Sequence, residues 1–196
     1  MRGRDIKRYS YEFADKWIIA TFPSRNYNID DYPAVKDYLL TLRKEKLEQS
    51  GKKNVYGIKG NNARKKTNNK WFETQDSIGY WEEFNKQKIA FPAIMTGGAF
   101  FSIVPKEYMV VAPGNIITGT NIIPLESFLT SDVCYFALRH FYMGGGIEGE
   151  LKVNRLLLLP IPLNIENRKH SLHDIQKLYK LTDEEMKFIS SSVRSK

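Results

Sequence analysis

The positive charge of this 196-residue chain is concentrated in one stretch, Arg43–Lys70. The stretch holds ten Lys or Arg residues against two acids, Glu45 and Glu48, which gives a local charge of +8. The formal net charge of the whole chain is also +8, so the other residues sum to zero. The basic stretch is expected at the surface against a polyanion such as nucleic-acid phosphate; the alternative is a solvated loop that only aids solubility.

The chain is apolar enough to build a sizeable core, with 42% hydrophobic and 13% aromatic residues. The length suits one domain with a small helical appendage, which we expect over residues 1–163 and 164–196. The single cysteine, Cys134, can form no intrachain disulfide, and a small buried thiol is expected there. No apolar run approaches the ~20 residues of a membrane-spanning helix. These features indicate a cytoplasmic protein without a membrane partner.

Local patterns predict a mixed α/β (α+β) fold, in which a small twisted, mostly antiparallel or mixed sheet is flanked by helices. Strand-like segments lie at Lys16–Phe22, Lys88–Ile94, Phe100–Val104, Glu107–Pro113 and Asn115–Ile123. Helices are expected near Pro33, after a cap at Thr74, and over Pro124–Met143 with a core face at Val133, Phe136, Ala137 and His140.

The last predicted helix has the clearest start. Thr182 and Glu185 have the spacing of a capping box, and Leu181 with Met186 that of a hydrophobic staple. Met186, Ile189 and Val193 then form an apolar stripe. This amphipathic C-terminal helix must therefore pack on the domain or on a neighbour.

No motif in the sequence indicates a catalytic or metal site. The glycines at 144–146 are not followed by the Lys-Ser/Thr of a phosphate-binding loop, and no Asn/Asp-Pro-Pro-Tyr/Phe run of an amino-methyltransferase is present. Asp132 with Glu150 and Lys152 loosely resembles the carboxylates and lysine of a Mg²⁺ nuclease. By itself the chain is expected to bind rather than to catalyse, with a small Mg²⁺-dependent nuclease as an alternative.

Five segments, in order, resemble one family. They are RGRDIKRY (Arg2–Tyr9), IDDYPAVKDYLL (Ile29–Leu40), ARKKTNNKWFETQD (Ala63–Asp76), YWEEFNKQKI (Tyr80–Ile89) and LLPIPL (Leu158–Leu163). Together they resemble the TaqI-like C-terminal specificity domain, which is the target recognition domain of adenine-N6 DNA methyltransferases and of type II (IIG) restriction-modification enzymes. The resemblance covers most of the chain.

The resemblance implies sequence-specific binding of double-stranded DNA. It also implies a parent enzyme whose methyltransferase domain binds S-adenosylmethionine, with a nuclease domain and Mg²⁺ where the parent also cleaves DNA. The chain itself would hold no cofactor. Met1 directly precedes the first of the five segments, which suggests a fragment of a longer enzyme. A noncatalytic RNA-binding protein is the other alternative, because a basic aromatic surface does not distinguish the nucleic acids.

Two basic clusters are candidate phosphate contacts. One is N-terminal and consists of Arg2, Arg4, Lys7 and Arg8; the other lies in the basic stretch and consists of Arg64, Lys65, Lys66 and Lys70. The N-terminal cluster has an alternative role, which is to pair with acids of the missing upstream domain.

The remaining candidates are uncharged. Asn68 and Asn69 could bond phosphate or adenine, or only form a turn, and Trp71 could stack on a base or anchor a core. Thr96, Gly97 and Gly98 are the first candidates for contacts with base edges, because glycine lets the backbone approach closely. An ordinary hairpin turn is the alternative there.

Overall fold

The computed structural model describes residues 1–144, 146–162 and 166–194, without the side chain of Arg194. Contacts divide the chain into two compact units. Residues 1–16 and 82–196 form one, here called the sheet unit, and residues 17–81 form the other, the basic unit. The expected boundary between residues 163 and 164 lies outside the described residues, and that division stays a prediction.

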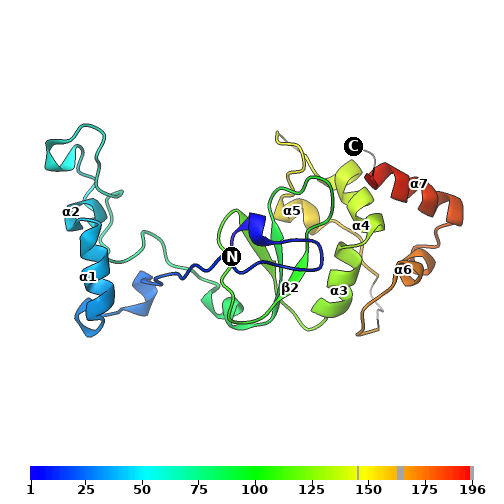
Figure 1. Cartoon of the computed structure of the whole chain (residues 1–196), viewed down its shortest axis with the longest axis horizontal. Coiled ribbons are helices and arrows are strands. Elements are labelled where there is room, and N and C mark those ends of the chain that lie inside the picture. The colour runs from blue at the N-terminus through cyan, green and yellow to red at the C-terminus, as the bar shows by residue number, and fades with distance from the viewer. Residues whose placement is uncertain (145, 163–165, 195–196) are drawn as a thin grey trace. The chain divides into compact units, whose positions relative to one another are not determined.

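The fold is mixed α/β, as predicted, with a small antiparallel sheet in the sheet unit (Figure 1). Strand β1 (Lys88–Pro92) lies between β2 (Ser102–Val104) and β3 (Gly114–Ile117). Every residue of β1 is buried. Even Lys88 is buried, because its ammonium donates to the carbonyl oxygens of Pro105 at 3.0 Å and Tyr108 at 3.2 Å. Burial lowers the pKa of Lys88.

The α-helices are distributed over both units. Those of the basic unit are α1 (Pro33–Thr41) and α2 (Lys44–Leu47). Those of the sheet unit are α3 (Ile122–Leu129), α4 (Asp132–Ala137), α5 (Val153–Leu156), α6 (Leu172–Leu178) and α7 (Asp183–Arg194). A π-helical turn, Leu138–Tyr142, continues α4. In the described part of the chain, no helix combines the length and the apolar character needed to cross a membrane.

Short 3-10 turns occur at Gly3–Asp5, Pro23–Arg25, Ile29–Asp31, Val55–Gly57 and Trp81–Asn85.

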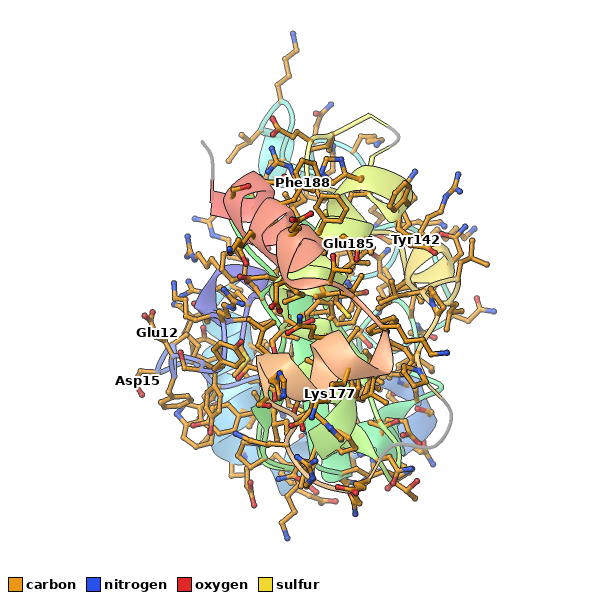
Figure 2. The ribbon with its side chains drawn as sticks, turned by 90° about the vertical axis from the view of Figure 1, so that its right-hand side faces the viewer. Glu12, Asp15, Tyr142, Lys177, Glu185 and Phe188 are labelled. Carbon is orange, nitrogen blue, oxygen red and sulfur yellow. The ribbon has the colours of Figure 1, made fainter. Side chains whose placement is uncertain are left out.

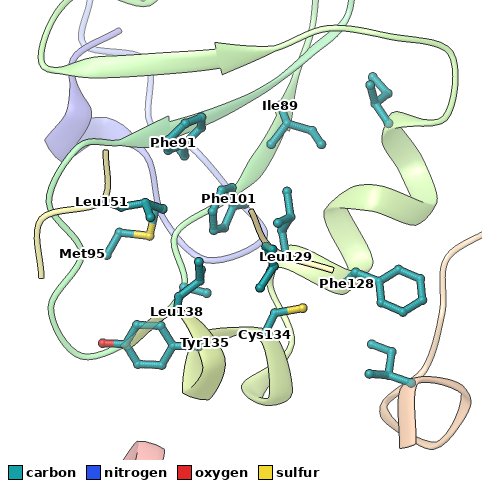
Figure 3. Close-up of a cluster of buried hydrophobic side chains, with 14 residues drawn as sticks. Ile89, Phe91, Met95, Phe101, Phe128, Leu129, Cys134, Tyr135, Leu138 and Leu151 are labelled. Atoms are coloured by element: carbon teal, nitrogen blue, oxygen red, sulfur yellow. The ribbon is translucent and has the colours of Figure 1, made fainter. Parts of the chain in front are cut away.

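The core of the sheet unit lies between the sheet and helices α3 and α4 (Figure 3). Phe91 of β1 and Phe101, which directly precedes β2, have ring centroids 5.2 Å apart and ring planes tilted by 32°. Leu129 and Leu138 meet them from the helices, and Phe101 and Leu138 are fully buried. Burial of large apolar side chains of this kind is the main source of stability in a small domain.

The C-terminal helix α7 begins as the sequence predicts. The Thr182 N–H donates to the Glu185 carboxylate at 2.7 Å, and the Glu185 N–H donates to the Thr182 hydroxyl at 3.2 Å. Met186 and Ile189 are buried, and α7 packs on α4. Figure 2 shows α7 with Glu185 near its start and Phe188 on the face turned to the viewer. The apolar stripe therefore packs on the sheet unit itself.

Two predictions for the basic unit are wrong. The segment Lys16–Phe22 is no strand, and Trp17 is 87% exposed, because an apolar run does not by itself provide a neighbouring strand. No α-helix follows Thr74, whose hydroxyl donates to the Asp76 carbonyl at 2.8 Å. Such local side-chain bonds compete with helix formation.

The segment Glu107–Pro113 is also no strand. The Val111 N–H donates to the Met1 carbonyl at 3.0 Å, so the segment bonds to the N-terminus instead of the sheet. Of the predicted strand Asn115–Ile123, only the first part belongs to β3, and Ile122 begins α3.

The predicted single helix over Pro124–Met143 is broken after α3. The Thr130 hydroxyl donates to the Glu126 carbonyl at 2.7 Å, and the Ser131 hydroxyl caps α4 by accepting from the Cys134 N–H at 3.1 Å. The predicted core face is confirmed only in part: Val133 and Ala137 pack half-buried against the core, Phe136 is half-buried, and His140 is exposed. The fully buried residues of this segment are Cys134, Tyr135 and Leu138.

Candidate nucleic-acid interface

The basic unit exposes nearly all of its concentrated charge. Of the ten cations in the stretch 43–70, nine are exposed: Arg43, Lys44, Lys46, Lys52, Lys53, Lys59, Lys65, Lys66 and Lys70. Lys70 lies 3.9 Å from a Glu73 carboxylate oxygen. Among the described residues, no acid lies within ion-pair distance of the other eight. Their charge is therefore available to an external anion.

Much of this charge lies on a double-stranded loop, here called the basic ribbon (residues 48–67). Its two arms bond to each other through the backbone: the Ala63 N–H donates to the Lys52 carbonyl at 2.9 Å, and the Val55 N–H donates to the Asn61 carbonyl at 2.7 Å. The arms are not regular strands. They nevertheless place lysines of both arms on one narrow projection, which a DNA groove could accept.

Arg64 is the cation of the stretch that is not exposed, and its guanidinium holds the base of the ribbon together. Its Nε donates to the Leu47 carbonyl at 2.6 Å, its Nη1 to the Glu73 carbonyl at 2.7 Å, and its Nη2 to the Trp71 carbonyl. Burial lowers the pKa of Arg64. We infer a structural role for Arg64, beside the phosphate contact that the sequence predicts.

Two amides complete this polar base. The buried Gln49 side chain donates to the Glu73 carbonyl at 2.8 Å and accepts from the Thr67 hydroxyl at 2.6 Å. The Asn69 amide donates to the Thr74 carbonyl at 3.0 Å. Asn69 thus has the turn-forming role that the sequence leaves open.

The other predicted residues of this region have free or partly engaged side chains. Lys65, Lys66 and Asn68 are exposed. Lys70 is exposed as well, although its ammonium donates to the Tyr27 carbonyl at 3.0 Å. Lys65 and Lys66 are therefore the cleanest candidates for phosphate contacts.

Trp71 is half-buried at the edge of the unit, whereas its neighbour Phe72 is buried. The two rings meet edge to face with centroids 5.7 Å apart, and the Lys44 ammonium lies 5.8 Å from the Trp71 ring centroid. Phe72 is thus the core anchor, and part of the indole stays accessible beside a cation.

In the N-terminal cluster, three of the four cations lie within ion-pair distance of acids of this same chain, and the two arginines make the short contacts. Arg2 Nη2 lies 2.8 Å from the Asp5 carboxylate, and Arg8 Nη2 lies 2.6 Å from that of Asp132. The hydrogen bond from Arg2 lowers the pKa of Asp5 to about 2. No upstream domain is needed to pair these two arginines.

The other two cations of the N-terminal cluster, Arg4 and Lys7, are exposed. The Lys7 ammonium donates to the Arg4 carbonyl at 3.0 Å and lies 3.9 Å from a Glu12 carboxylate oxygen. Both remain candidates for phosphate contacts.

The loop between β1 and β2 borders a pocket in the sheet unit. Thr96 and Gly97 are exposed, Gly98 is buried, and Gly97 has a φ of +83°, which favours glycine. The pocket has a volume of about 220 Å³. Its lining comes from Met95, Thr96, Gly97, Tyr135, Arg139, Met143, Gly144, Glu148 and Gly149.

The two carboxylates of the nuclease alternative are not among the residues that line this pocket, and each has a cationic neighbour. Asp132 is bound by Arg8, and a Glu150 oxygen lies 3.8 Å from the Lys152 ammonium. The described residues include no cluster of three or more His, Cys, Asp or Glu side chains that could hold a metal ion.

Sequence reasoning did not identify Gln49 or the pocket residues Arg139 and Glu148. No local pattern predicts the structural role of Gln49, because its hydrogen-bond partners lie about twenty residues away in a loop. The glycine-rich segment around Glu148 predicts a tight turn, but it does not predict that the turn borders a pocket.

Comparison with known proteins adds no relative: no family model matches the chain, and a search of the curated proteins finds no significant match.

Proposed function

We propose that this chain binds duplex DNA as a target recognition module, and that its basic unit grips the phosphate backbone. The observation that carries the proposal is the set of nine exposed cations on and around the basic ribbon, eight of which have no acid within ion-pair distance among the described residues. Cations left unpaired in this way gain by displacing the counterions of DNA.

Charge alone positions a protein on DNA without reading its sequence. Sequence preference would come from the sheet unit, where Thr96 and Gly97 border a pocket of suitable size for base contacts. In this proposal the chain works with a methyltransferase domain that binds S-adenosylmethionine, and with Mg²⁺ where the parent enzyme also cleaves DNA. The proposed location is cytoplasmic, which the single buried thiol of Cys134 suits.

RNA binding is the second candidate, because one aromatic side chain of the ribbon is accessible for stacking. Tyr56 is 44% exposed, and the Arg43 guanidinium carbon lies 5.1 Å from its ring centroid. Such an aromatic–cation pair can stack on an unpaired base.

A competition experiment separates the two candidates. The full chain is bound to a labelled DNA duplex of random sequence, and unlabelled duplex DNA, single-stranded DNA, duplex RNA and single-stranded RNA are added as competitors at matched nucleotide concentration. Duplex DNA should compete best. Stronger competition by single-stranded RNA would replace the proposal with the RNA-binding alternative, and no binding of any of the four would refute both.

A metal-dependent activity test covers the third class. The same duplex, incubated with the chain and Mg²⁺, should stay intact. Cleavage that is lost in Asp132→Ala or Glu150→Ala would favour the nuclease alternative.

A further inference from the structure

The pocket of the sheet unit brings together one cation and one acid from distant parts of the sequence. Arg139 comes from the π-helical turn that continues α4, and Glu148 comes from the glycine-rich turn after it. Thr96 and Gly97 contribute the rim from the loop between β1 and β2.

Arg139 has a hydrogen-bond partner outside the pocket. Its Nη1 donates to the Ser192 carbonyl of α7 at 3.3 Å. The C-terminal helix thus orients a guanidinium whose other N–H donors remain available at the pocket wall.

The backbone beside Glu148 is held in place by Gly149. The Met95 N–H donates to the Gly149 carbonyl at 2.9 Å, and a Cβ atom at Gly149 would collide with the Met95 carbonyl oxygen. Only glycine allows the two loops to approach this closely, and the approach brings Glu148 to the same pocket as Thr96.

The floor of the pocket is apolar. Met95 and Tyr135 are almost completely buried, and Figure 3 shows both side chains at the edge of the hydrophobic core. Met143 also lines the pocket. Thioether and aromatic side chains suit a flat, polarisable ring. The volume of about 220 Å³ lies below the roughly 300–1,000 Å³ typical of drug-sized ligands, so a single ring system fits better than a dinucleotide.

The ligand must therefore be small and flat, with acceptors for a guanidinium and donors for a carboxylate. Among the DNA bases, guanine meets this requirement best. Its O6 and N7 are adjacent acceptors for an arginine fork, and its N1 and N2 are adjacent donors for a carboxylate. Adenine presents a donor where guanine has O6, and neither pyrimidine has both a pair of adjacent acceptors and a pair of adjacent donors.

We propose that this pocket binds a single guanine base that has left the helix stack, with Arg139 at its O6 and N7 and Glu148 at its N1 and N2. The base must be unstacked, because N1 and N2 are occupied by cytosine in a duplex. The inference rests on the proposed DNA binding for its biological setting, but the pocket can be tested apart from it.

The first test uses the full chain and short duplexes that carry one unpaired guanine, adenine, cytosine or thymine. The unpaired guanine should bind about tenfold more tightly than the other three, as expected of a good bidentate contact. Replacing this guanine by 7-deazaguanine removes N7, and replacing it by hypoxanthine removes the N2 donor. Each change should weaken binding to the wild-type chain.

The variants show which side chain recognises which edge. Arg139→Ala should no longer distinguish guanine from 7-deazaguanine, and Glu148→Ala should no longer distinguish guanine from hypoxanthine. Arg155→Ala and Glu184→Ala are matched controls, because both side chains are exposed and lie outside the pocket lining. The controls should keep both preferences.

The second test needs no DNA duplex. Guanosine monophosphate should shift the NMR signals of the Met95 and Met143 methyl groups, and adenosine monophosphate should not. Equal binding of all four unpaired bases, with normal binding of the intact duplex, would overturn the guanine pocket and leave the proposed function standing. If guanosine monophosphate shifts the methionine signals but the chain binds no duplex, the guanine pocket would stand and the proposed function would be refuted.

Discussion

The interior of the sheet unit and the interior of the basic unit are stabilised by different interactions. The sheet unit has a core of large apolar side chains from the sheet and helices, such as Phe91, Phe101 and Leu138. In the basic unit the buried apolar residues are few, and the base of the ribbon is held by Gln49 and Arg64, whose side chains bond to backbone carbonyls.

The difference extends to the charges. In the sheet unit the arginines Arg2 and Arg8 are paired with acids of the same unit. In the basic unit, Arg64 donates to three backbone carbonyls and so stabilises the base of the ribbon, whereas the surrounding lysines are exposed. A unit built in this way can present many cations without pairing them, which is what an anion-binding surface requires.

Loss of a core ring should produce the largest effect on stability. Phe101→Ala should lower the free energy of unfolding of the sheet unit by about 3–5 kcal/mol, because it removes a fully buried side chain and leaves a cavity. Denaturant unfolding measures the change. Phe188→Ala, at a residue that is 63% exposed, is the matched control and should cost less than about 1 kcal/mol. Equal costs would mean that the apolar cluster is not the core.

Loss of the buried guanidinium should weaken the basic unit. Arg64→Met should cost about 2–3 kcal/mol of local stability, because the carbonyls of Leu47, Trp71 and Glu73 lose a charged donor. Hydrogen exchange at the Ala63 amide, which lies in the ribbon, reports this loss.

The matched control for Arg64→Met is Lys65→Met at the exposed neighbouring position. It removes the same charge and should change the free energy of local opening, measured by hydrogen exchange at the Ala63 amide, by less than about 0.5 kcal/mol. Unchanged exchange in the Arg64 variant would show that the polar base does not hold the ribbon.

The ion pair of Arg2 with Asp5 should give the sheet unit a smaller, pH-dependent stability. Because the pKa of the folded Asp5 is lowered to about 2, its contribution is fully present above the ordinary pKa near 4 and is lost as the pH falls towards 2. Asp5→Asn should remove about 1–2 kcal/mol at neutral pH and flatten the stability profile between roughly pH 4 and 2. Parallel profiles for the two proteins would contradict this assignment.

The parts of the fold that could be predicted depend on local sequence. The cap of Thr182 with Glu185 and the predicted strand Lys88–Ile94 each depend on a few neighbouring residues. The cap is confirmed, and the strand is found as β1 over Lys88–Pro92. The predicted strand at Lys16–Phe22 is wrong, because pairing needs a partner that the segment itself does not specify. The break between α3 and α4 was not predicted, because Ser131, a helix cap, was included inside one continuous helix.

The candidate site was predictable in composition but not in geometry. The charge of the ribbon is visible in the sequence, whereas the distinction between Arg64 and Lys65 depends on carbonyls brought in from Leu47 and Trp71. The pocket was harder still, because Arg139 and Glu148 meet Thr96 only in the folded chain. Long-range contacts of this kind leave no local pattern.

The most direct test of the central claim is the salt dependence of duplex DNA binding. Lys65→Ala with Lys66→Ala removes two exposed cations of the basic ribbon, and Lys177→Ala with Lys187→Ala removes two exposed cations of helices α6 and α7 as a control of equal net charge. The slope of log K against log salt should become flatter by about 1.8 in the ribbon variant, since each lost phosphate contact contributes about 0.9. In the helix variant it should stay nearly unchanged. Equal slopes in both variants and the wild-type chain would contradict the claim that the basic ribbon binds the DNA backbone.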